Sequence, residues 1–396
     1  MKERATLEAF DERFASGRAL LLRQAAERLE RAAPDLFAHV ERAGGAGLRE
    51  PLLWAWMQHE QPPLGLDQIL FGYLREEDRP ARIQVRANHR GVVHLPNLGS
   101  LRTAAPDAVL ELRWRDTDAS LALWRDARPL EAVFTSRRVV PGTSIELHTD
   151  PHPLFPAFFP GAPSPGEIDI EGASIRCLPA LTRALAWLAR ISPRQRADID
   201  RDCRALVVLR SEGINSFAAP GILGAAFLSV PEDPTEIFFC EDLVHQVGHV
   251  SFYAITAARC FTIPPQTPVA LFTVLKHDHR TLDAAFHGNY TLTRMAQCFD
   301  ACLDDSALDP RLRHELLGRF SLSLSRLGPG LESIDDERLY TPDAWALHQT
   351  MIAIYEDILT RRCDLLAGYD LSNQPYVFDH ARFCALNPPP GAAALT

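Results

Sequence analysis

The spacing of the hydrophobic residues changes along this chain, and this change most constrains the fold that it can adopt. In residues 5–44, Leu and Phe recur at helical spacing with Glu and Arg between them, which predicts one or two amphipathic helices. From about residue 80 to residue 150, apolar and polar residues alternate in short runs between Asn, Asp, Gly and Pro. These runs, of which Ser144–His148 is the last, predict four to six short antiparallel strands.

A Pro-rich segment at residues 150–166 separates this part from a second one, in which most apolar residues return to helical spacing. His148 and His152 flank the segment, and we interpret both as loop histidines. The chain is therefore predicted to have an α+β fold. Its three regions are N-terminal helices with an antiparallel β-sheet, a Pro-rich linker, and a mainly helical metal-binding domain, at residues 1–150, 151–170 and 171–390.

Composition narrows the class of partner. The formal net charge of −10 argues against nucleic acid, because phosphate binding favours a basic surface, but it leaves a peptide partner open. The chain has no apolar run of membrane-spanning length, and its charged start does not resemble a signal peptide. Eight cysteines without a C-x-x-C motif suggest reduced thiols, so we expect a cytoplasmic protein that contacts no membrane.

The most informative motif lies in residues 240–260, which are predicted to be helical. His245 and His249 are four residues apart and so share one helix face, where two imidazoles can bind one metal ion. The spacing is that of the H-E-x-x-H zinc helix, except that Gln246 stands where the motif has Glu. A Gln amide cannot take a proton from metal-bound water, so ordinary metallopeptidase chemistry is not expected.

A metal bound by two histidines on one helix needs a third ligand from elsewhere. His287 is the first candidate and Asp283 the second; a carboxylate would give the 2-His-1-carboxylate set of non-haem iron oxygenases. Glu241 is a weaker candidate, which could instead orient His245. If residues 278–294 are helical, then Arg280, His287 and Arg294 share one face at seven-residue spacing.

Three stretches resemble the H-E-x-x-H-motif peptide-modification proteins, also described as 2-oxoglutarate-dependent peptide β-hydroxylases, which accompany ribosomally made, post-translationally modified peptides. The second stretch resembles the family's Leu-Val-His-Glu-x-x-His, and the third its Asp-Pro-Arg-Pro-Leu…Leu-His-Gly-x-Tyr. The matched stretches are Asn215-Ser-Phe-Ala-Ala-Pro-Gly-Ile-Leu-Gly-Ala-Ala-Phe-Leu-Ser, Asp242-Leu-Val-His-Gln-Val-Gly-His and Asp278-His-Arg-Thr-Leu-Asp-Ala-Ala-Phe-His-Gly-Asn-Tyr.

The resemblance implies that His245, His249 and His287 bind the metal. It also implies that Arg280 holds a carboxylate of 2-oxoglutarate, since a guanidinium can bind a carboxylate through two parallel hydrogen bonds. Around this set we predict catalytic positions and cofactor-binding positions. The catalytic positions are Gln246 and Tyr290; the further cofactor-binding positions are Arg294, Ser216 and Asn289.

The sequence thus leads to one main hypothesis and two alternatives. The main hypothesis is an Fe(II)- and 2-oxoglutarate-dependent dioxygenase that uses O2 to hydroxylate a side-chain β-carbon in a ribosomally made precursor peptide. The first alternative is a catalytically inactive homologue that binds or scaffolds the peptide, with Gln246 marking the loss of activity. A zinc hydrolase is the second alternative, and Gln246 argues against it. A homodimer is left open.

Overall fold

The computed structural model describes residues 6–115, 117, 119–159, 168–257, 272–273 and 279–389; for 272–273 and 279–280 the description is confined to the backbone. The fold is α+β, as predicted. The chain divides into two compact units, each formed by separate segments. The sheet unit comprises Ala19–Thr182 and Asp200–Asp233; the helical unit comprises Met1–Arg18, Arg183–Ile199 and Pro234–Thr396.

The two units have boundaries that differ from those of the predicted regions. The reason is a three-stranded sheet in which β8 (Glu146–His148) and β10 (Ala225–Ser229) both pair with β9 (Ala205–Leu209). Segments on either side of the Pro-rich stretch therefore belong to one sheet. Of that stretch, residues 160–167 lie outside the described residues.

The antiparallel strands predicted from the alternating runs form two sheets in the sheet unit. One has the order β1-β4-β5-β6 and the other the order β2-β3-β7. Their inward residues form a common apolar cluster around Leu101, Leu112 and Leu123. The strands are β1 (Arg82–Arg86), β2 (Val92–Leu95), β3 (Gly99–Thr103), β4 (Val109–Arg115), β5 (Ser120–Arg125), β6 (Arg128–Leu130) and β7 (Ala132–Ser136).

Strand β8 corrects the expectation that the run ending at His148 belongs to the antiparallel set. It pairs with β9 in parallel, and the connection between them contains α5 (Glu171–Ile191) and α6 (Pro193–Asp202). Parallel strands need a long crossover of this kind. All five residues of β9 are buried, as expected for a strand covered on both faces.

Helices precede the sheets, first a long one and then shorter ones. Pro occupies the first position of both α2 and α3, where its missing N–H costs no helical hydrogen bond. Glu50 caps α3, since its Oε1 accepts the backbone N–H of Leu52 at 2.9 Å. These helices are α1 (Asp11–Ala32), α2 (Pro34–Arg42), α3 (Pro51–Trp56) and α4 (Leu66–Leu70).

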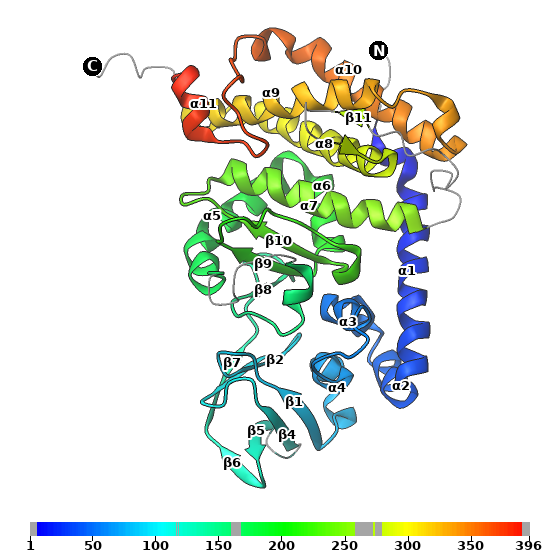
Figure 1. The fold of residues 1–396 in the computed structure, drawn as a ribbon, viewed down its shortest axis with the longest axis vertical. Helices are drawn as coiled ribbons and strands as arrows, with labels where there is room; N and C mark the ends of the chain where they lie inside the picture. Colours follow the sequence, from blue (N-terminus) through cyan, green and yellow to red (C-terminus); the bar gives the residue numbers. More distant parts are fainter. Residues whose placement is uncertain are drawn as a thin grey trace, which may run out of the picture. The chain divides into compact units, whose positions relative to one another are not determined.

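The helical unit is dominated by long helices, of which α7 packs on α8, and α8 on α9 and α10 (Figure 1). The helices are α7 (Glu236–Ala257), α8 (Leu282–Leu303), α9 (Pro310–Glu332), α10 (Pro342–Leu366) and α11 (His380–Leu386). A short antiparallel pair, β11 (Phe272–Thr273) and β12 (His279–Arg280), precedes α8. Among the described helices, none combines the length and apolar character that crossing a membrane requires.

Candidate metal centre

Helix α7 is buried on almost every side, and the exception is the face that carries the two predicted ligands. Between residues 237 and 255, only Glu241, His245, His249 and Tyr253 are not fully buried. These positions follow each other at intervals of four, so they form one stripe along the helix. The apolar residues of α7 hold the helix in the core, and the stripe leaves its histidines within reach of a ligand.

Helix α8 supplies the third histidine, but it begins later than the sequence suggests. Thr281 caps the helix, its Oγ1 accepting the N–H of Ala284 at 3.2 Å, and residues 279–280 form β12. The expectation of one helical face from Arg280 to Arg294 is therefore wrong at its first member. The side chain of Arg280 lies outside the described residues, so its predicted contact with a carboxylate stays a prediction.

The three histidines lie together. His249 Nδ1 is 2.7 Å from His287 Nε2, a hydrogen bond in which one ring donates to the other. The rings of His245 and His249 are 4.9 Å apart between centroids, and the ring of Phe252 stacks on that of His287 at 4.1 Å. Burial, and then repulsion from His245, lowers the pKa of His287 to about 3. His287 is therefore neutral at neutral pH, the form that binds a metal.

Gly248 explains how the two helices come close enough for this contact. A Cβ at Gly248 would lie 3.2 Å from Thr291 Cγ2 and 3.4 Å from Arg294 Cδ. The first distance is shorter than ordinary van der Waals contact, so a larger residue at this position would push α7 and α8 apart. The glycine between Gln246 and His249 thus has a packing role next to the site.

The three histidines suit a transition-metal ion, provided that two of their rings move slightly apart. Three neutral imidazoles are a common ligand set for zinc and iron. Two nitrogens on one tetrahedral ion with bonds of 2.0–2.1 Å are roughly 3.4 Å apart. His249 Nδ1 and His287 Nε2 are closer than this at 2.7 Å, so their rings would have to separate slightly to share an ion.

Gln246 lies beside the stripe but is turned into the protein. It is 2% exposed, and its Nε2 donates to Asp242 Oδ1 at 2.9 Å. Its Oε1 is buried without a hydrogen-bond partner. The amide is therefore held as a donor to a buried carboxylate, which an ionised Glu at this position could not be. A catalytic role for Gln246 stays a prediction.

Tyr290 and Arg294 are both in the core of the helical unit. Tyr290 is 0% exposed and lies against Phe252, with ring centroids 5.4 Å apart. Arg294 Nη2 is 2.9 Å from Asp198 Oδ2, and its Nη1 is 3.4 Å from the Tyr290 hydroxyl. A co-substrate carboxylate at Arg294 would have to compete with Asp198, so the predicted second cation is already paired.

The remaining predicted residues, Asn289, Ser216 and Asp283, differ in burial and in the unit to which they belong. Asn289 is buried and faces α9, where a Cβ at Gly330 would lie 2.3 Å from its Oδ1. Ser216 belongs to the sheet unit, where its Oγ accepts the N–H of Ser229 at 2.8 Å. Asp283 is exposed.

Glu241, the weaker candidate for the third ligand, belongs to the same stripe of α7 but is already paired. Its Oε2 lies 2.6 Å from Arg319 Nη1. This pair is held on the α9 side, because Arg319 also binds Glu315. This pair uses Oε2 of Glu241, and the role of Glu241 in orienting His245 stays a prediction.

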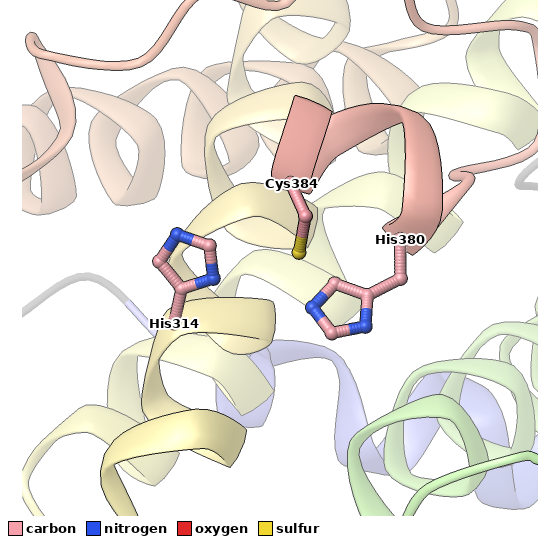
Figure 2. Close-up of side chains that lie close together, drawn as sticks. All are labelled: His314, His380 and Cys384. Atoms are coloured by element: carbon pink, nitrogen blue, oxygen red, sulfur yellow. The ribbon is translucent and has the colours of Figure 1, made fainter. Parts of the chain in front are cut away.

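Two further groups of side chains that could hold a metal ion were missed in the sequence. In the described residues, each brings three ligand atoms within 4.8 Å of one another, and the three predicted histidines are not among these groups. The first is His314 on α9 with His380 and Cys384 on α11, and Figure 2 shows the three side chains pointing toward one another. The i, i+4 spacing on α11 is the signal that could have found it.

The second group is His94, Glu146 and His148, all in the sheet unit. The interpretation of His148 as a loop histidine is wrong, because it ends strand β8 and is buried. His152 does lie in a loop, but it is also buried. The Glu-x-His spacing within a strand could have found this group, since residues i and i+2 point to one face.

Comparison of the sequence with protein-family models and with curated proteins adds no relative to these observations. No protein-family model matches the chain, and no curated protein is significantly similar to it in sequence. Membership of the peptide-modification family therefore stays a prediction that depends on the three matched stretches.

Proposed function

We propose that the protein is an Fe(II)- and 2-oxoglutarate-dependent hydroxylase that acts on a side-chain β-carbon of a ribosomally made precursor peptide. In this proposal, the iron is bound by His245, His249 and His287. The observation that carries it is the open stripe on an otherwise buried helix, with a third histidine from α8 in contact with the second. The resemblance over the matched stretches supplies the reaction class.

The described residues support distinct parts of this chemistry. Fe(II) with 2-oxoglutarate and O2 supplies the oxidising power when bound. His287 is a neutral donor, and Phe252, stacked on it, excludes water from one side of that ring and fixes its orientation. Tyr253, whose ring centroid is 5.2 Å from that of His287, borders the same open stripe and is placed to contact a substrate. Arg280 is left as the co-substrate anchor, since Arg294 is paired with Asp198.

The test is an anaerobic titration of the metal-free protein with Fe(II) and 2-oxoglutarate, which reads the visible charge-transfer band of an iron-bound 2-oxo acid. We expect the band in the wild-type protein. It should disappear in His245→Ala and His287→Ala and weaken in Arg280→Ala. His89→Ala is the matched control, because His89 is exposed in the sheet unit and should leave the band unchanged.

Two outcomes contradict the proposal. One is a folded wild-type protein that binds Fe(II) but shows no band with 2-oxoglutarate. The other is a band that survives His287→Ala, because that result would mean that His287 does not bind the iron. Circular dichroism of each variant separates loss of the site from loss of the fold.

A second candidate, a peptide-binding homologue without catalysis, is favoured by one observation. The hydrogen bond between His249 and His287 satisfies both nitrogens without a metal. This candidate predicts peptide affinity that chelators leave unchanged, together with Fe(II) binding no tighter in the wild type than in His245→Ala.

A further inference from the structure

Strand β8 presents two ligand-type side chains on one face. Glu146 and His148 are two residues apart, so in a strand they point the same way, and both are buried. His94 approaches from β2, which belongs to a different sheet of the same unit. The ring of His94 lies 4.7 Å from that of His148 between centroids. Two sheets therefore meet at two imidazoles and a carboxylate.

The distance between His94 and Glu146 suits two ligands of one metal ion, and the two side chains do not form a hydrogen bond. His94 Nε2 is 3.3 Å from Glu146 Oε1, yet this buried nitrogen has no hydrogen-bond partner. Donor atoms on one tetrahedral ion stand roughly 3.4 Å apart. The other carboxylate oxygen, Glu146 Oε2, accepts the N–H of Asn97 at 3.0 Å, which fixes the carboxylate and leaves Oε1 facing His94.

The contact with His94 does not satisfy the buried Glu146 carboxylate, because His94 Nε2 makes no hydrogen bond to it. A buried carboxylate without a good partner is costly. A bound cation would offset this cost.

We propose that His94, Glu146 and His148 bind a divalent first-row transition-metal ion, in a site separate from the histidines of α7 and α8. Two imidazoles and one carboxylate suit zinc and iron, and water would complete the coordination. The ion would tie β2 to β8 and so join two sheets of one unit. Little of the set is open to solvent, with side-chain exposures of 17% for His94 and 10% for Glu146, which fits a stabilising role.

His152 is beside the group but is not a ligand. Its Nδ1 accepts the N–H of Leu154 at 3.2 Å, which places the proton of the neutral ring on Nε2. That Nε2 has no hydrogen-bond partner among the described residues. With its ring 5.7 Å from that of His94, His152 is positioned to donate to a water on the ion.

The experiment is a titration of metal-free full-length protein with Co(II), followed by visible absorption, and with Zn(II), followed by calorimetry. Both use a His245→Ala, His380→Ala background, which removes the contributions of the other two groups. We expect one bound equivalent with the d–d bands of low-coordinate Co(II). Losing an outer partner of a metal ligand costs about 10–100-fold in affinity, so losing a ligand in His148→Ala should cost at least about 100-fold.

Glu146→Gln keeps the shape of the side chain and is the second variant, for the case that His148→Ala does not fold. It should weaken binding by at least about tenfold, while His89→Ala leaves it unchanged. The proposal is overturned if the background protein binds no Co(II) or Zn(II), or if Glu146→Gln binds as tightly as His89→Ala. Failure of the α7 site would not affect this result, because that site is already removed.

Discussion

His249 Nδ1 and His287 Nε2 are 2.7 Å apart, although the two residues are separated by 38 positions in the chain. This contact requires α7 and α8 to pack closely, and Gly248 provides the space next to it. The geometry of the candidate metal centre therefore depends on a residue that binds nothing itself.

Gly248→Ala tests this dependence. The added Cβ would lie 3.2 Å from Thr291 Cγ2, and neither this β-branched side chain nor Arg294, fixed by Asp198, can move away easily. Overpacking costs about 1–3 kcal/mol, and the better helix propensity of Ala returns up to about 1. We expect a net loss of about 1 kcal/mol in the free energy of unfolding, measured with urea, and weaker Fe(II) binding. Gly368→Ala, with open space around it, should be near neutral.

Asp198→Asn tests the assignment of Arg294 to the core. Removing one partner of a buried ion pair costs about 3–5 kcal/mol, because the other charge stays buried. We expect a loss of that size in urea unfolding. The exposed pair of Arg338 and Asp336 is the control, and Arg338→Ala should change stability by less than about 1 kcal/mol. If Asp198→Asn instead keeps its stability and tightens 2-oxoglutarate binding, then Arg294 serves the co-substrate.

A feature of the fold could be predicted from the sequence where its pattern lies within a few neighbouring residues. Alternation located β1, β2, β4 and β5, and apolar spacing located α7, because each pattern is set within a few residues. The parallel pairing of β8 could not be predicted, since its partner β9 lies beyond two helices. Local pattern alone does not reveal which distant strand a run will meet.

The candidate site likewise has some contacts that local spacing predicts and others that it does not. The pairing of His245 with His249 follows from helical spacing alone, whereas the commitment of Arg294 to Asp198 depends on a contact between segments 96 residues apart. The group of His94, Glu146 and His148 was missed because it needs two sheets to meet. Side chains that converge from distant segments are visible only in the fold.

Glu50 makes the stability of the protein depend on pH. Burial, and then the charge of Glu146, raise its pKa from 4.5 to about 7 in the folded state. A carboxyl group whose pKa is raised on folding favours the folded state at low pH, so its contribution is lost as the pH rises from about 4.5 to about 7. The loss is about 3 kcal/mol. Glu50→Gln should abolish this part of the pH dependence, measured by urea unfolding of the metal-free protein at pH 5 and pH 8, and an unchanged slope would contradict the assignment.

Gln246→Glu restores the residue that the H-E-x-x-H motif carries, and the structure predicts that it destabilises the protein. The new carboxylate would replace the amide that donates to Asp242 Oδ1 at 2.9 Å, and both side chains are buried. Two charges about 3 Å apart repel by several kcal/mol even at an effective dielectric constant of 20, so one carboxyl group will take up a proton. Protonation of a Glu at pH 7 costs about 3–4 kcal/mol, which sets the upper limit of the destabilisation.

The same reasoning predicts the rescue. Asp242→Asn alone removes the charge that Gln246 donates to, at a cost of about 1–3 kcal/mol. Combined with Gln246→Glu, it gives an amide that donates to a carboxylate, the original hydrogen bond with its partners exchanged. We expect the double variant to be more stable than Gln246→Glu by at least about 2 kcal/mol at pH 7, and the gain to shrink at pH 5, where the paired carboxyls are more easily protonated. Additive effects of the two substitutions would mean that Asp242 does not determine the residue at position 246.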